Sequence, residues 1–169
     1  TKIHRLGDDV KQTLKVASIF GFRFPKDIII DAFCALRRSW EEESSVVAFD
    51  EVKGSDDDQF AYFSTIAGTS LRVAKKNGII ERTSQGYQFG HDKFQEEFRD
   101  MVEPSELPMI HKLIGKCLLK KETEAIRGGE ENIYLAALHL NESLKLGGML
   151  MVNGFLARIN FEASEYCRD

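Results

Sequence analysis

The sequence predicts a mainly α-helical chain with one small β-hairpin, and three observations support this prediction. Apolar residues recur at the helical spacing of three and four through most of the 169 residues. Residues 79–83 and 87–89 break that spacing, because they are β-prone runs that flank the turn Ser84-Gln85-Gly86. His91-Asp92 then opens a new segment with helical spacing. A helix, a hairpin wing and a further helix in this order indicate a winged-helix domain.

Three helices are expected before the hairpin. Asp8 and Asp9 open an apolar-periodic segment at residues 10–20, and Pro25 suits the first position of a helix at residues 26–38. Between these two helices, Phe22-Arg23-Phe24 is expected to form a short connector.

The third helix is predicted at residues 59–77. It ends at Gly78, because glycine readily adopts the left-handed conformation that follows many helices. Its expected buried stripe consists of Phe60, Phe63, Ile66, Ala67, Ser70, Leu71 and Ala74.

Two residues, one in the hairpin turn and one after the hairpin, are expected to shape the backbone. Gly86 tolerates a positive φ, which short hairpin loops require. Asp92 can cap the following helix by accepting backbone N–H bonds.

An acidic insert, residues 41–58, separates the second and third helices. It holds eight acids against the single Lys53 and is expected to be an exposed loop. The acids lack the spacing of a calcium-binding EF-hand loop, so a solvated insert is the default interpretation.

The second half of the chain is expected to be helical throughout. Glu103-Pro104-Ser105 interrupts the chain, and helical segments follow at residues 107–121, 132–146 and 149–167. The last two are joined by glycines and resemble one repeat of an antiparallel, TPR-like array. The predicted domains are therefore a winged-helix domain at 8–103, with the insert 41–58, and a helical segment at 104–169.

Composition excludes several classes of protein. A formal charge of −4 argues against binding to a phosphate backbone as the main function, and no apolar run is long enough to span a membrane. Cys34, Cys117 and Cys167 have neither zinc-site nor disulfide spacing. A cytoplasmic setting is expected, and the absence of an initiator Met suggests a piece of a longer protein.

No catalytic residue and no metal ligand is predicted. The single Gly-Lys pair, Gly115-Lys116, lies mid-helix and is followed by Cys117, so it is not a P-loop. His111 and His139 are interpreted as helix-surface or packing residues.

DNA binding is the usual association of a winged helix, but the charge pattern does not favour it. The basic and amide candidates in the third helix gather at its C-terminal end, and Asp56, Asp57 and Asp58 precede its N-terminus. The wing offers Arg82. The candidates in the helix are Gln59, Arg72, Lys75, Lys76 and Asn77.

Five phrases, in order, resemble the region after the ATPase core of STAND-type (AAA-like) signalling ATPases, as found in large multidomain kinases and nucleotide cyclases. The phrases are LKVASIFGFRF (residues 14–24), YQFGHDKFQEEF (87–98), HKLIGKCLL (111–119), ENIYLAALHLNESLKL (131–146) and LARINFEASEYC (156–167). With the helix–loop–helix and the hairpin that lie between them, the match spans nearly the whole chain in order, apart from the acidic insert.

The resemblance implies a non-catalytic arm that couples the nucleotide state of an adjacent ATPase domain to a kinase or cyclase output. ATP or ADP and Mg²⁺ would bind that adjacent domain, and the helical repeats would bind protein partners. His91 matches the histidine of the His-Asp motif that reaches the β-phosphate of ADP in related plant resistance receptors, although Gly90 stands where that motif usually has a bulky residue.

Three alternatives stay open. His91 can be a structural residue hydrogen-bonded between hairpin and helix. The chain can be a winged-helix DNA-binding transcriptional regulator, or a pure protein-interaction scaffold without a link to nucleotide.

Overall fold

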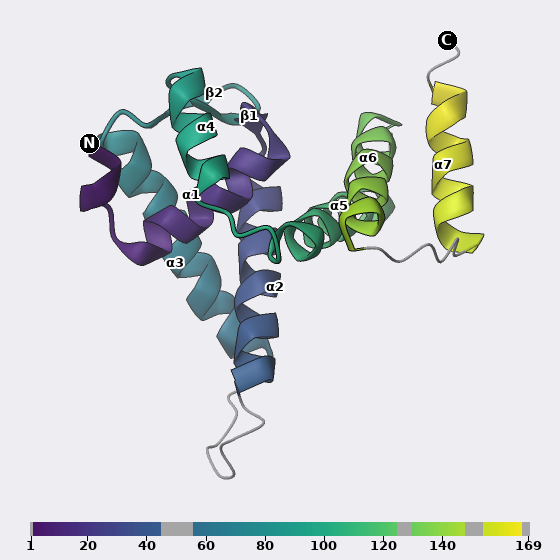
Figure 1. The fold of residues 1–169 in the computed structure, drawn as a ribbon, viewed down its shortest axis with the longest axis horizontal. Coiled ribbons are helices and arrows are strands. Elements are labelled where there is room, and N and C mark those ends of the chain that lie inside the picture. Colours follow the sequence, from purple (N-terminus) through teal and green to yellow (C-terminus); the bar gives the residue numbers. More distant parts are fainter. Residues whose placement is uncertain (1, 45–55, 125–129, 148–153, 167–169) are drawn as a thin grey trace. The chain divides into compact units, whose positions relative to one another are not determined.

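The computed structural model describes residues 2–44, 56–124, 130–147 and 154–166. The chain divides into two compact units, an N-terminal unit (Thr1–Val102) and a C-terminal unit (Glu103–Asp169). The described residues are mainly α-helical and include one three-stranded antiparallel sheet (Figure 1). The coarse fold class predicted from the sequence is therefore confirmed.

The described residues of the N-terminal unit form a short 3₁₀-helix, η1 (Lys2–Arg5), and four α-helices. Helix α1 runs across α2 and α3 and packs against both (Figure 1). The side chains buried between these helices are large and apolar, with Leu14, Ile29, Phe33 and Leu71 almost fully buried. The four helices are α1 (Asp8–Phe20), α2 (Lys26–Ser44), α3 (Asp56–Lys76) and α4 (Asp92–Asp100).

The sheet has the order β1-β3-β2, so the last strand of the hairpin lies in the middle. It is built from β1 (Arg23–Phe24), β2 (Ile80–Thr83) and β3 (Gly86–Phe89). Tyr87 and Phe89 are buried and alternate with the half-buried Gly86 and Gln88 along β3, so one face of this strand points into the core.

The segment Phe22-Arg23-Phe24 connects α1 to α2 as expected, but the prediction missed that Arg23 and Phe24 form strand β1 and pair with β3. The strand has only two residues, too few to show the alternation by which strands are recognised in a sequence. Packing explains it instead: Phe24 is buried, and its ring lies 5.5 Å from that of Phe89.

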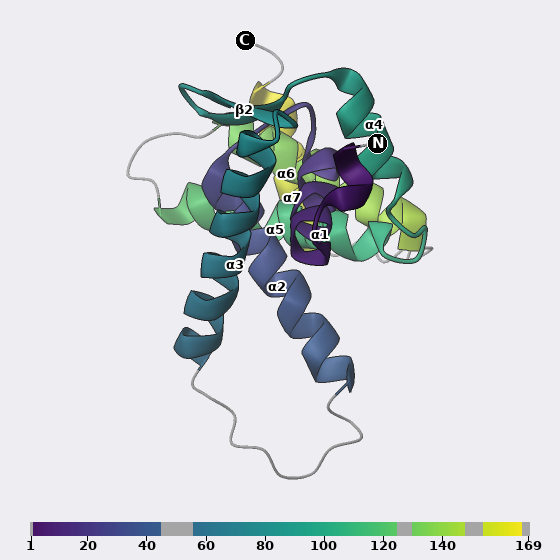
Figure 2. The ribbon, with the colours of Figure 1, turned by 90° about the vertical axis from the view of Figure 1, so that its left-hand side faces the viewer.

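Both helices next to the acidic insert are longer than predicted. Helix α2 continues to Ser44 and α3 already begins at Asp56, so both ends of the predicted loop are helical. Glutamates are good helix formers, and aspartates in a first turn interact favourably with the helix dipole, although neither adds apolar periodicity. Residues 45–55 lie outside the described part. Figure 2 shows α2 and α3 diverging toward their ends at the insert.

Phe60 is the exception to the predicted buried stripe of α3. It is 37% exposed, whereas Phe63, Ala67, Ser70, Leu71 and Ala74 are buried as predicted, and Ile66 is half-buried. Phe60 lies near the divergent end of α3, where its ring stacks on the Arg38 guanidinium, 5.6 Å from the ring centre.

Gly78 ends α3 as predicted. Its φ is 69°, and the N–H groups of Gly78 and Ile79 donate to the carbonyls of Lys75 and Ala74. This pair of bonds is a Schellman motif, which satisfies carbonyls that the helix leaves without partners.

The C-terminal unit consists of α5 (Leu107–Glu124), α6 (Glu130–Gly147) and α7 (Gly154–Tyr166). Helices α5 and α6 pack antiparallel. A Cβ atom built on Gly115 would lie 2.7 Å from Leu140 Cγ, so glycine is what permits this close approach. Helix α7 packs on another side of α6 through a small cluster of Ala137, Ile159 and Ala163.

Gly86 is expected to be the glycine on which the sheet depends most. Its φ is 151°, and an added Cβ would overlap the Phe24 carbonyl oxygen and lie 3.0 Å from Pro25 Cα. We predict that Gly86→Ala lowers the free energy of unfolding by about 1–3 kcal/mol in urea denaturation.

Gly68→Ala is the matched control, because Gly68 lies within α3 and has no atom within 4 Å of an added Cβ. It should stabilise the protein by about 0.5–1 kcal/mol, since glycine is unfavourable inside a helix. Equal effects of the two substitutions would contradict the tight approach of β1 to β3.

Candidate functional site

Gly90, the residue before His91, anchors the end of the hairpin and so determines the position of the candidate site. The Gly90 N–H donates to the Ile79 carbonyl oxygen at 2.8 Å, which ties the end of the hairpin to its base. A Cβ on Gly90 would lie 3.1 Å from the Gly78 carbonyl oxygen. The close approach of these two backbone segments gives a physical reason for glycine here in place of a bulky residue.

Helix α4 is held in place by one apolar and two polar contacts. Phe98 is fully buried, with its ring 6.3 Å from that of Phe89. The side chains of Gln95 and Arg99 donate to the Ser18 carbonyl oxygen, at 3.1 and 3.5 Å. Ser18 lies in the last turn of α1, where carbonyls lack helical partners, so α4 completes the end of α1.

His91 is the N-cap residue of α4. Its backbone is extended, and its Nδ1 accepts a hydrogen bond from the Lys93 backbone N–H at 3.1 Å. Because Nδ1 is the acceptor, the neutral imidazole carries its proton on Nε2. The side chain is exposed, so this donor is accessible at the start of a helix.

The predicted capping role of Asp92 is therefore wrong. Asp92 is the first residue of α4, whereas His91 has the extended backbone that an N-cap requires. Asp92 still contributes an acid to the first turn, where the helix dipole favours negative charge.

The arrangement suits recognition of an anionic oxygen. A neutral imidazole can donate from Nε2 without first taking up a proton, and the first turn of a helix favours nearby negative charge. The hydrogen bond to Lys93 also fixes the ring, which reduces the entropy lost on binding.

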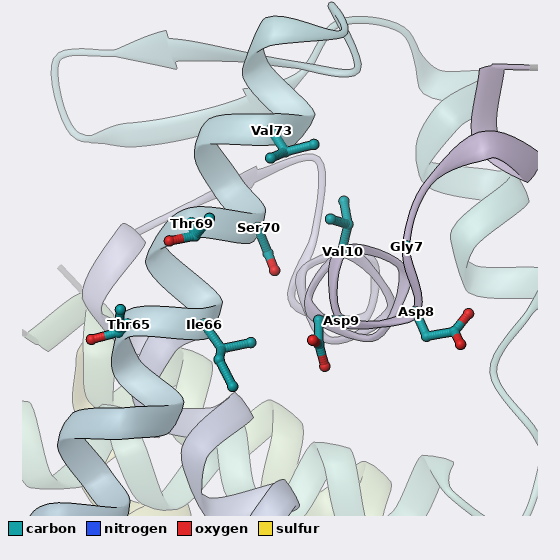
Figure 3. Close-up of a pocket in the computed structure, with 9 residues that line it drawn as sticks. All are labelled: Gly7, Asp8, Asp9, Val10, Thr65, Ile66, Thr69, Ser70 and Val73. Atoms are coloured by element: carbon teal, nitrogen blue, oxygen red, sulfur yellow. The ribbon is translucent and has the colours of Figure 1, made fainter.

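A second candidate is a pocket of about 320 Å³ between the first turn of α1 and one face of α3 (Figure 3). In Figure 3 the side chains of Ile66, Ser70 and Val73 point from α3 toward α1, with Val10 opposite them. Asp9 lies at this pocket and forms an ion pair of 3.7 Å with Arg37. Most of the wall is apolar, and its polar groups are the carboxylates of Asp8 and Asp9 and the hydroxyls of Thr65, Thr69 and Ser70.

Two of the three cysteines are described. Burial, together with the charge of Asp31, raises the pKa of the Cys34 thiol to about 11, so it is not a reactive thiolate at neutral pH. Cys34 is buried, whereas Cys117 is only half-buried. Cys167 lies outside the described residues.

The structure brings His111 and His139 together, which sequence reasoning missed. Their Nδ1 atoms are 2.9 Å apart across α5 and α6. His111 and His139 are 28 positions apart in the sequence, so no short-range spacing pattern indicated that they would meet. Among the described residues, no group of three or more His, Cys, Asp or Glu side chains could hold a metal ion.

Comparisons with known proteins do not show a family for this chain. No protein-family model matches it, and no solved structure matches it. It is 25% identical over 109 residues to the genome polyprotein of Rice tungro spherical virus (strain Vt6). That alignment covers 64% of this chain and 3% of the polyprotein. Within the described ranges, no helix has the length and apolar character needed to cross a membrane.

The cap predicts how substitutions at His91 change stability. His91→Ala should lower the free energy of unfolding by about 0.5–2 kcal/mol and speed amide hydrogen exchange in α4, because the Lys93 N–H loses its partner. His91→Asn should keep both near the original values, since asparagine is a good N-cap. If amide exchange in α4 became equally faster in His91→Ala and His91→Asn, the capping role would be contradicted.

Proposed function

We propose that the chain is a non-catalytic regulatory module of a multidomain STAND-type ATPase. It couples the nucleotide state of an adjacent ATP-binding domain to a signalling output, a kinase or a cyclase. The observation that carries this proposal is the rigid presentation of His91 Nε2 at the start of α4. The ordered resemblance of five phrases to this class of protein supports it.

We infer that the N-terminal unit is a winged-helix domain. Its elements follow the order α1, β1, α2, α3, β2 and β3, and the sheet order is β1-β3-β2. Both orders are those of winged-helix domains. The β2–β3 hairpin is then the wing, and α4 is the helix that follows it.

His91 is the proposed contact to the β-phosphate of ADP. Its exposed Nε2–H can donate to a phosphate oxygen while Nδ1 stays bonded to Lys93. Contact with ADP in one arrangement of the domains and not in another would make docking of this unit depend on the nucleotide. Nucleotide and Mg²⁺ would bind the adjacent domain, and any hydrolysis would occur there.

The C-terminal unit is the proposed partner-binding part, the beginning of a TPR-like array in a cytoplasmic protein. Its antiparallel helices expose several large apolar side chains, which is typical of surfaces that bind proteins. These side chains are Tyr134, Leu138, Leu146 and Phe161.

The side chains of α3 support this function over DNA binding. Arg72 donates to the Gly68 carbonyl and to the Thr69 hydroxyl, and the Asn77 amide donates to the Val73 carbonyl. These two candidate base readers are thus bonded within their own helix. Asp57 and Asp58 lie in the first turn of α3, where their negative charges would repel a phosphate backbone.

The test is the affinity for ADP of the longer protein that carries the ATPase domain and this chain. His91→Asn keeps the cap of α4 but removes the imidazole donor, so affinity should fall about tenfold, or about 1.4 kcal/mol, in calorimetry. His4→Asn is the matched control, because His4 is also an exposed histidine of the N-terminal unit.

Unchanged ADP affinity in His91→Asn would reject the phosphate contact and favour a pure interaction scaffold. An equal loss in the His4 control would also reject it, because the effect would not depend on the start of α4.

A further inference from the structure

Three polar or close contacts lie in register along the interface of α5 and α6. The Ser143 hydroxyl donates to the Pro108 carbonyl oxygen at 2.7 Å at one end. At the other end a Cβ on Gly115 would lie 3.3 Å from the Ala136 carbonyl oxygen, so glycine allows the two helix backbones to approach closely. The histidine pair, His111 and His139, lies between these contacts.

A hydrogen bond between two imidazoles restricts their protonation. One Nδ1 must carry a proton and the other must offer a lone pair, a condition that holds when the pair is neutral or carries one added proton. When both rings are imidazolium ions, both Nδ1 atoms are donors and the two like charges repel. At 2.9 Å there is no room for a water molecule to separate them.

We propose that the hydrogen bond between His111 and His139 is an acid-sensitive clamp, which holds α5 and α6 together at neutral pH and releases them when both imidazoles are protonated. The proposal concerns the C-terminal unit and does not depend on the role of His91.

Burial sets the direction of the pH dependence. His139 is 7% exposed, and burial, with a smaller effect of the charge on His111, lowers its pKa to about 4. An unfolded histidine titrates near pH 6.5, so below that pH the unfolded chain binds the proton more strongly. The contribution to stability is therefore complete above about pH 6.5 and declines as pH falls toward 4.

Burial and His111, rather than a charged side chain of the surrounding helices, set the pKa of His139. On α6, Glu142 lies about one turn from His139, and its Oε1 forms an ion pair with Lys145 Nζ at 3.4 Å. On α5, Lys112 and Lys116 flank the interface and are exposed, and Arg158 of α7 is also exposed. The two causes that lower the His139 pKa are burial and His111.

The test is hydrogen exchange of the full chain between pH 7.5 and 4.5, corrected for the intrinsic effect of pH on exchange. Protection of α5 and α6 should fall by up to about tenfold per pH unit below pH 6.5. Peptides from α1 and α3 serve as the internal reference, because both described histidines of the N-terminal unit, His4 and His91, are exposed. Parallel loss of protection in both units would overturn the proposal.

His139→Asn supplies the matched variant, since its side-chain N–H can donate to His111 but does not titrate in this range. Protection of α5 and α6 in this variant should become nearly independent of pH, and a decline as steep as in the original protein would overturn the proposal. Independently of that variant, an NMR titration of the original chain should find the His139 ring neutral down to about pH 5. Titration near pH 6.5 would overturn the clamp.

Discussion

Phe89, at the end of β3, packs between Phe24 of the neighbouring strand and Phe98 of α4, with ring centres 5.5 and 6.3 Å away. Its N–H also donates to the Phe22 carbonyl oxygen at 3.0 Å. These contacts join the sheet to the helix that follows it. Because only Gly90 separates Phe89 from His91, the buried ring also determines where the exposed imidazole lies.

The same arrangement explains why a short segment can hold a side chain rigidly at the surface. Helix α4 has only nine residues, which is marginal for a helix in isolation. Its stability comes from Phe98 in the core and from Gln95 and Arg99 on the last turn of α1. His91 adds a further contact by capping the first turn.

The C-terminal unit depends on a different balance of interactions. Between α6 and α7 the contacts are largely small and apolar, with a pair of amide hydrogen bonds between Asn141 and Asn160. Between α5 and α6, buried polar groups at His139 and Ser143 must find partners across the interface. Buried polar contacts are strong when satisfied and costly when broken, which makes this interface the more sensitive of the two.

The sequence predicted elements whose signals are local. Apolar spacing revealed the helices, and Gly78 and Gly86 marked backbone positions that few other residues adopt. What it could not reveal depends on contacts between distant residues. Strand β1 exists because Phe24 packs on β3, and His91 rather than Asp92 caps α4 because the chain leaves the hairpin extended. The pairing of His111 with His139 required the register of two helices.

The candidate site was predictable in part. His91 stood out because it lies between a hairpin and a helix, but the bond from the Lys93 N–H to its Nδ1, which leaves Nε2 as the donor, depends on how the chain folds at the start of α4. The Gly90 position, which departs from the related motif, is explained by its approach to the backbone of Gly78. The pocket beside α1 combines residues from the start of one helix and the middle of another, so no single stretch of sequence indicated it.

The central proposal is that His91 Nε2 contacts a phosphate of ADP. The most direct measurement is the ¹⁵N and ¹H resonance of this ring N–H in the longer protein, with ADP and with adenosine. The proposal predicts that ADP shifts the resonance and slows exchange of its proton with water, whereas adenosine, which has no phosphate, does neither. The same response to both ligands, or to neither, would contradict it.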